Sequence, residues 1–173
     1  ERHVEDLIEE TLAADVVVRR ALSTEVELRA PSGREPAFVA LGHGTLWARA
    51  ESGTPGIDIG HGSINVLVRS GTVLLDAAAG AGLLIVLRGT ASMMSGGETV
   101  VIAFAGQAFT FDPTGGYQGP DPVDANELAQ DPFVSINLVH DALGEVPTPV
   151  PALDGPPSGL TDPIDGDGDR RRG

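Results

Sequence analysis

The sequence contains no cysteine and no lysine, and only 4% of its residues are aromatic. Without cysteine, disulfides, thiolate catalysis and cysteine-ligated metal sites are excluded. Trp47 and Tyr117 are the only tryptophan and tyrosine. A carbohydrate-binding groove, which uses surface aromatic side chains, is therefore disfavoured, although the sequence alone does not exclude a pair of carboxylates for glycosidic chemistry.

Long apolar runs are also absent from the sequence. No run approaches the roughly 18 to 20 residues that a bilayer-spanning helix needs. No signal peptide opens the chain, and residue 1 is Glu rather than Met. We therefore expect a fragment or a processed product, in which a targeting segment or membrane anchor would lie upstream of Glu1.

The chain is strongly acidic, with a formal net charge of −14 over 173 residues. This charge argues against non-specific binding to nucleic acid or to an anionic membrane, and it favours solubility. The length fits one domain with attachments. The 23 glycines and 13 prolines favour many short strands and turns over long helices.

Glycines recur every nine residues from Gly44 to Gly89, and the register resumes at Gly97 after a slip of one residue. Most of the runs between them are short, alternating and rich in β-branched residues, which predicts strands separated by glycine turns. The expected strands are 24–29, 37–41, 45–50, 57–59, 64–69, 72–77, 83–87, 90–94, 99–104 and 107–111. They predict a mostly β fold, either a two-sheet sandwich or a short β-roll of about 8–10 strands. Leu83 to Leu87 is continuously aliphatic, which predicts burial on both faces.

The N-terminal residues 1–22 carry an apolar stripe with a helical spacing. Val4, Leu7, Ile8, Leu12 and Val16 are three or four residues apart, which predicts an amphipathic helix. Two interpretations stay open: a helix packed on the domain, or a stalk or self-association helix.

The expected domains are the N-terminal helix at 1–22, the β domain at 23–112, a loop with a short helix at 113–143, and a tail at 144–173. Asp124 predicts the start of one short helix, and Asp131 with Pro132 predicts the cap and first residue of another that runs to Asp141. Phe133, Ile136 and Val139 would share its buried face. The tail is rich in Pro, Gly and Asp, which predicts a disordered or extended segment.

No catalytic, cofactor-binding or metal-binding residues are predicted. His43 and His61 lie in glycine turns two repeats apart, and we favour surface turn histidines over a two-histidine metal site. A calcium-binding roll would need Gly-Gly-x-Gly-x-Asp in every repeat, but only Asp58 and Asp76 occupy comparable places. Asp165, Asp167 and Asp169 match only the first half of a calcium loop. His140 and Asp141 are adjacent, but no Gly-x-Ser-x-Gly sequence accompanies them.

Residues 44–112 resemble the extracytoplasmic domain of FecR-type proteins. That family shows a Gly-Thr followed by an apolar strand, which matches Gly71-Thr72 here. A strand ending in Val-Leu-x-Gly follows in the family, which matches Ile85–Gly89. The next strand ends in Ala-Gly-Gln, which matches Val100–Gln107. Gly44-Thr-Leu-Trp47 is similar to the start of the family's preceding strand. Asp131-Pro-Phe133, with Asn137 and Asp141, is similar to a short helix that follows such domains in actinobacterial proteins.

The resemblance implies a non-enzymatic β domain outside the cytoplasmic membrane, in the periplasm or at the cell surface, without a cofactor. It would act as a protein–protein interaction module in membrane-attached signalling or envelope organisation, with the N-terminal helix and the Asp131 helix facing the partner. The alternative function is a self-assembling structural subunit, of the filament or surface-layer type, because glycine-bounded strands can associate through open edges.

Overall fold

The structure, a computed structural model, describes residues 7–78 and 81–144. These residues form ten strands and two short helices, so the prediction of a mostly β fold is confirmed. None of the helices among these residues is long and apolar enough to cross a membrane. The strands are β1 (Leu7–Ala13), β2 (Val16–Ala21), β3 (Glu25–Arg29), β4 (Ala37–Ala50), β5 (Ile57–His61), β6 (Ile64–Ala78), β7 (Ala81–Ser95), β8 (Glu98–Phe104), β9 (Gln107–Phe111) and β10 (Tyr117–Pro122). The helices are α1 (Ala125–Ala129) and α2 (Pro132–Gly144).

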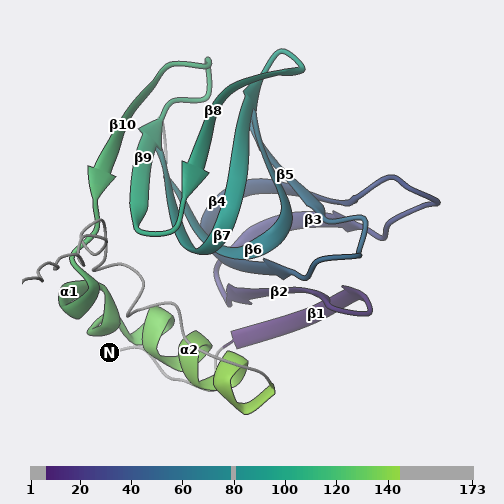
Figure 1. The fold of residues 1–173 in the computed structure, drawn as a ribbon, viewed down its shortest axis with the longest axis vertical. Helices are drawn as coiled ribbons and strands as arrows, with labels where there is room; N and C mark the ends of the chain where they lie inside the picture. Colours follow the sequence, from purple (N-terminus) through teal and green to yellow (C-terminus); the bar gives the residue numbers. More distant parts are fainter. Residues whose placement is uncertain (1–6, 79–80, 145–173) are drawn as a thin grey trace, which may run out of the picture.

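All ten strands belong to one mixed sheet that folds over on itself (Figure 1). It folds because β4, β6 and β7, of 14 or 15 residues each, change neighbouring strands midway. We call one half the covered layer: β1, β2, β9 and β10 with residues 44–50 of β4, 71–78 of β6 and 81–89 of β7. The other half is the open layer: β3, β5 and β8 with residues 37–43, 64–68 and 90–95 of the same long strands.

Three glycines of the predicted turn register lie where the long strands pass between the layers. Gly44 and Gly89 have φ angles of +114° and +73°. A Cβ at Gly71 would lie 2.4 Å from the carbonyl oxygen of Arg88. Glycine permits a bend inside a strand as readily as a turn between strands. The separate strands expected on either side of these glycines are therefore continuous, and the strands form one folded sheet.

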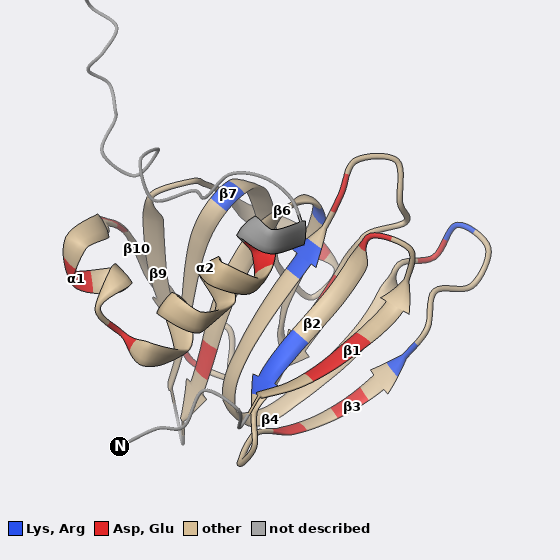
Figure 2. Cartoon of the chain, turned by 90° about the horizontal axis from the view of Figure 1, so that it is seen from below, with Lys and Arg blue, Asp and Glu red and all other residues tan. Residues whose placement is uncertain are grey.

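The helix predicted over residues 1–22 is wrong where the structure describes it, because β1 and β2 form an antiparallel hairpin there. The chain turns at Asp15, whose φ is +63°. Val16 to Val18 are β-branched and buried in a strand between β1 and β4, and sheet pairing outweighs the helical spacing of the stripe. Figure 2 shows acidic residues along β1 and β3 and a basic segment on β2. Residues 1–6 lie outside the described residues.

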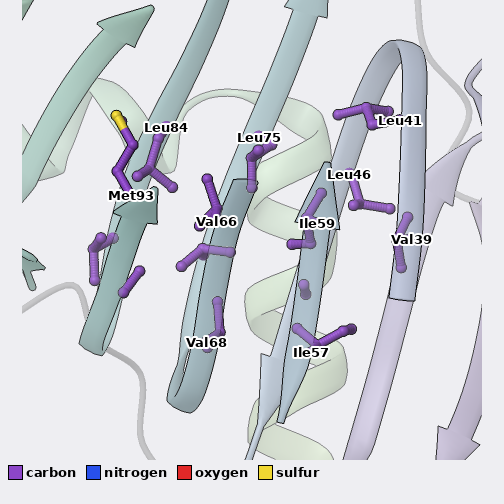
Figure 3. Packing of buried hydrophobic residues seen from close by; sticks show 14 of the residues in the cluster. Val39, Leu41, Leu46, Ile57, Ile59, Val66, Val68, Leu75, Leu84 and Met93 are labelled. Atoms are coloured by element: carbon purple, nitrogen blue, oxygen red, sulfur yellow. The ribbon is translucent and has the colours of Figure 1, made fainter. Parts of the chain in front are cut away.

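The main hydrophobic core lies between the two layers (Figure 3). It takes the inward residues of both, such as Ile59 and Val66 from the open layer and Leu75 and Leu84 from the covered layer. A second core lies on the other face of the covered layer, where the helices pack. Leu84 and Val86 contribute to the first core and Ile85 and Leu87 to the second, which confirms the prediction that this run is buried on both faces.

Both predicted short helices are present, each capped by an aspartate. Asp124 accepts hydrogen bonds from the backbone N–H groups of Asn126 and Glu127. Asp131 accepts one from Phe133 N at 2.8 Å, ahead of Pro132 at the first helical position. The predicted face of α2 is partly wrong, because Val139 is 51% exposed. The tail predicted from 144 onward lies almost entirely outside the described residues.

Candidate functional site

A buried polar cluster lies between α2 and the covered layer, and we call it the Asp141 cluster: Arg19, Trp47, Asn137 and Asp141. Arg19 and Trp47 are register partners on β2 and β4 and share one face of the sheet. Asn137 and Asp141 are four residues apart, so they share one face of α2. Exposure is 3% for Arg19, 1% for Trp47, 0% for Asn137 and 9% for Asp141.

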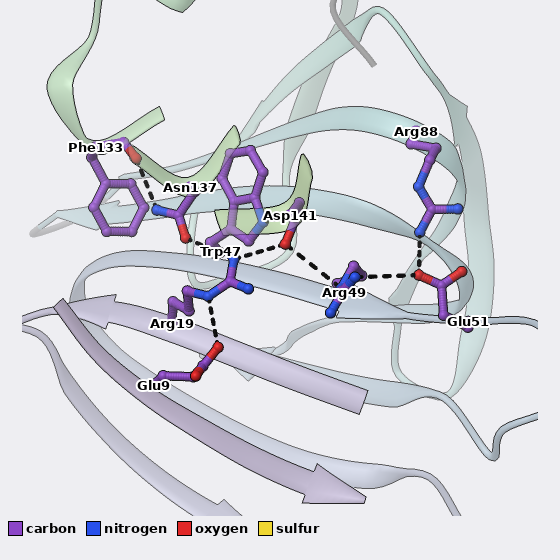
Figure 4. Close-up of polar contacts among 9 residues, drawn as sticks. All are labelled: Glu9, Arg19, Trp47, Arg49, Glu51, Arg88, Phe133, Asn137 and Asp141. Carbon is purple, nitrogen blue, oxygen red and sulfur yellow. Dashed lines mark hydrogen bonds and ion pairs between the residues drawn. The ribbon is translucent and has the colours of Figure 1, made fainter. Parts of the chain in front are cut away.

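Asp141 joins the helix to two strands through charge-assisted hydrogen bonds (Figure 4). Its Oδ1 accepts from Arg19 at 2.8 Å, and its Oδ2 accepts from the Trp47 indole Nε1 at 3.0 Å. Asn137 Oδ1 accepts a second bond from Arg19 at 3.3 Å, and its Nδ2 donates to the carbonyl oxygen of Phe133 at 2.8 Å. Both strands are thereby tied to α2 by groups that are largely shielded from water.

The cluster continues to the surface as a chain of alternating charges. On one side, Glu9 accepts from Arg19 Nε at 2.9 Å, with 51% of its side chain exposed. On the other side, Arg49 Nε lies 3.7 Å from Asp141 Oδ1. Glu51 then pairs with Arg88 at 2.8 Å. Each charged group of the chain has an opposite charge beside it, which offsets part of the cost of removing Arg19 and Asp141 from water.

The Asp141 cluster attaches α2 to the covered layer. The carboxylate of Asp141 is occupied by Arg19 and Trp47 on both oxygens. His140, its neighbour in sequence, is exposed. Because buried polar partners must meet in one geometry, the cluster fixes the axial position and rotation of α2 on the sheet.

The structure brings together residues that the sequence named in separate motifs. Trp47 belongs to the strand-start motif and Asn137 and Asp141 to the helix motif of the FecR resemblance. Sequence reasoning missed Arg19 as a member, because it placed Arg19 near the end of a helix. The signal was alternation: in a strand, Val17 and Arg19 point to the same face, and Val18 points to the main core.

The histidines His43 and His61 have different surroundings. His43 is exposed, with Nε2 3.7 Å from Glu25. His61 is buried, its Nδ1 lies 3.0 Å from the carbonyl oxygen of Leu41, and its ring meets Phe111 edge-on. The prediction of a surface position therefore holds for His43 and is wrong for His61, which β5 turns inward. No three His, Cys, Asp or Glu side chains in residues 7–78 and 81–144 group together as metal ligands.

Two of the carboxylates named in the calcium-site alternatives, Asp58 and Asp76, have hydrogen-bond partners within the sheet. Asp58 accepts from Asn65 Nδ2 at 2.8 Å, and Asp76 accepts from Thr45 Oγ1 at 3.1 Å. Asp165, Asp167 and Asp169 lie outside the described residues.

A depression of about 720 Å³, which we call the β3–β5 groove, lies on the open layer. Its floor includes Phe38 and Ala40 of β4, which point away from the core because Val39 between them points into it. Gly60 keeps the floor low, since a Cβ there would meet the Phe38 ring at 3.4 Å. Its other lining residues are Arg20, Thr24, Glu25, Val26, Glu27, Leu41, Gly42, Gly62 and Asn65. The groove is thus lined by both apolar and charged groups.

Asp112, in the turn after β9, has a pKa that is lowered from its ordinary value of 3.8. The Thr114 hydroxyl has the largest effect, and the backbone N–H groups of Gly116 and Thr114 add to it. All of them donate to the Asp112 carboxylate and favour its charged form.

We expect Thr114→Ala to raise the pKa of Asp112 toward 3.8. Because the folded pKa is lowered, the turn's contribution to stability is present above the ordinary pKa and is lost as the pH falls through the folded value. A carboxyl NMR titration measures the shift, and Thr114→Ser, which keeps a hydroxyl, serves as the control. An Asp112 pKa unchanged in Thr114→Ala would contradict the assignment.

No family model matches the sequence, and no curated protein matches it. The fold is similar to two crystal structures, at 1.65 and 2.50 Å resolution, each described as a putative anti-sigma factor from Parabacteroides distasonis. The TM-scores are 0.57 and 0.54, with 11% and 12% sequence identity over 72% of this chain. This chain spans 60% and 64% of the length of those two chains. At this identity, the likeness concerns the fold alone.

Proposed function

We propose that this chain is a FecR-like, non-enzymatic extracytoplasmic domain that acts as a protein-interaction module in a membrane-attached signalling or envelope protein. The observation that carries the proposal is the fold likeness to two structures described as putative anti-sigma factors. The short motifs at Gly71-Thr72, Gly89 and Gly106-Gln107 support it, because they lie in the strands that build this folded sheet and in the turn between β8 and β9.

The two layers have different roles in this proposal. Helices cover the outer face of the covered layer and are fixed there by the Asp141 cluster and by the apolar contacts of Phe133 and Val134. In the described residues, no helix packs on the outer face of the open layer. The covered layer therefore provides rigidity, and the open layer presents the surface on which a partner docks.

The β3–β5 groove is the part of the open layer best suited to a protein segment. Phe38 offers an aromatic floor, with the Arg29 guanidinium stacked on its ring at 4.9 Å. Exposed carboxylates of Glu25 and Glu27 line one side. A segment that combines an apolar residue with basic side chains would fill the floor and neutralise this rim.

Site-specific photo-crosslinking in the native cell tests the proposal. A photoreactive amino acid at Phe38 is expected to give one discrete adduct with an envelope or signalling protein. The same amino acid at Val139, on the exposed side of α2, is the matched control. Equal labelling at both positions would contradict docking in the groove.

A separate experiment tests the compartment. The chain is fused to a reporter enzyme that is active only outside the cytoplasm, and the fusion is expected to be active. An inactive fusion would contradict the extracytoplasmic location.

A further inference from the structure

Most of the large apolar side chains exposed in the described chain lie together beside β8. Six are exposed in total, and four of them form one patch: Val100 (38%), Ile102 (50%), Phe104 (53%) and Tyr117 (40%). The first three alternate along β8 and face outward, because Ala103 between them points into the core. Tyr117 joins them from β10, where its hydroxyl lies 3.4 Å from the Val100 carbonyl oxygen. We call these four residues the β8 patch.

The β8 patch carries no charge of its own. Between Glu98 and Asp112 the sequence contains no charged residue, although the whole chain has a net charge of −14. An exposed apolar strand without charges is the kind of surface that soluble proteins bury against another protein.

The β8 edge differs from the other three edges of the folded sheet. β1 carries Glu9 and Glu10, β3 carries Glu25, Glu27 and Arg29, and β10 carries Pro120 and Pro122. Charges and prolines on an edge strand prevent unwanted pairing with other chains. β8 pairs with β7 alone and has neither device from residue 99 to 104.

At the centre of this edge, the backbone N–H and C=O of Ile102 are oriented to hydrogen-bond with another strand. The N–H of Phe104 donates to Gln107 Oε1 at 2.9 Å, so it points away from β7. Because backbone groups alternate in direction along a strand, the N–H and C=O of Ile102 also point away from β7. On the N-terminal side of Ile102, the carbonyl oxygen of Val100 already lies beside the Tyr117 hydroxyl.

We propose that two copies of this chain associate through β8, antiparallel, about a two-fold axis beside Ile102. Ile102 then lies opposite Ile102 of the second copy, with one pair of backbone hydrogen bonds between them. Val100 of each copy lies opposite Phe104 of the other, so exposed apolar side chains of the two copies contact each other across the joined strands. Each Glu98 lies opposite Gly106 of the other copy, so the carboxylates are kept apart. The surface is separate from the β3–β5 groove.

The protection of the other three edges determines the size of the assembly. A filament needs two different surfaces on each subunit, whereas a two-fold contact uses the same surface on both and closes. With β8 as the single unprotected edge among the described strands, association stops at a dimer. On this proposal the chain self-associates as a closed dimer, and the filament or surface-layer subunit stays the alternative that the test distinguishes from it.

Light scattering of the full chain after size exclusion, up to roughly 300 μM, tests the dimer in a range that covers micromolar affinities. The expected mass is twice 17.8 kDa. Ile102→Lys puts two like charges on the axis and is expected to weaken association by about 30-fold or more, as at an interface hot spot. Val139→Lys, at a 51% exposed position on α2, is the matched control and stays dimeric.

A cysteine cross-link tests the register separately from the affinity. The chain has no cysteine, so Ile102→Cys introduces the only thiol. Paired residues on antiparallel strands have Cα atoms about 5.5 Å apart, within the range for a disulfide. Mild oxidation is expected to cross-link Ile102→Cys and to leave Val139→Cys uncross-linked. A wild-type chain that stays at the monomer mass of 17.8 kDa at every concentration, a mass that grows without limit, or equal cross-linking of both variants would overturn the proposal.

Discussion

Replacing Asp141 with alanine is expected to lower the free energy of unfolding by about 3–5 kcal/mol, the usual loss when one partner of a buried ion pair is removed. Arg19 is 3% exposed and would keep its charge without the carboxylate 2.8 Å away. The Trp47 indole N–H would also lose its acceptor in a site closed to water. Urea unfolding, followed by circular dichroism, measures the loss as a shift of the midpoint.

Glu9→Ala is the matched control, because Glu9 pairs with the same arginine at 2.9 Å but has 51% of its side chain exposed. Exposed pairs contribute about 0–1 kcal/mol, so the control is expected to change stability little. The double variant Arg19→Met/Asp141→Leu removes both buried charges and is expected to be more stable than Asp141→Ala. Equal losses for Asp141→Ala and Glu9→Ala would show that the buried cluster does not hold α2.

Gly89→Ala is expected to cost about 3 kcal/mol or more, because backbone strain and a backbone clash add to each other. Gly89 has a φ of +73°, and a Cβ there would lie 2.2 Å from the Ser70 carbonyl oxygen and 2.8 Å from Gly71 Cα. Those atoms belong to β6, which crosses between the layers at the same level. To relieve the clash, β6 and β7 would have to separate at the fold of the sheet.

Gly97→Ala separates the two effects. Gly97 has a φ of +87°, and a Cβ there would have no neighbouring atom within 4 Å, so only the strain of about 1 kcal/mol remains. Thermal and urea unfolding of the two variants under one condition give the comparison. If Gly89→Ala and Gly97→Ala lose the same stability, the close approach of β6 and β7 at Gly89 has no energetic role.

Short-range patterns in the sequence predicted the elements whose geometry is local. Asp124 and Asp131 cap the two helices because a cap depends on residues only two or three positions away. The run from Leu83 to Leu87 predicted a strand with two buried faces, since an unbroken aliphatic run has no side suited to water. These predictions needed no knowledge of distant contacts.

The same short-range patterns predicted the wrong element where two different local structures fit one pattern. Leu7, Ile8, Leu12 and Val16 fit a helical stripe, yet the hairpin of β1 and β2 gains pairing with β4, which lies far along the chain. Gly44, Gly71 and Gly89 fit turns, yet they permit bends inside long strands. Tertiary pairing decided both cases, because local conformational preferences differ by less than the stabilisation from a central strand.

The sequence alone determined the class of the fold, the two helix caps and the acidic, cysteine-free character of the chain, because these follow from composition and from neighbouring residues. Only the tertiary structure decided which residues meet. It placed Arg19 and Trp47 under Asp141, more than ninety positions from either along the chain. It also left β8 as the unprotected edge, because strand neighbours are set by how the long strands fold over, and no local pattern specifies that.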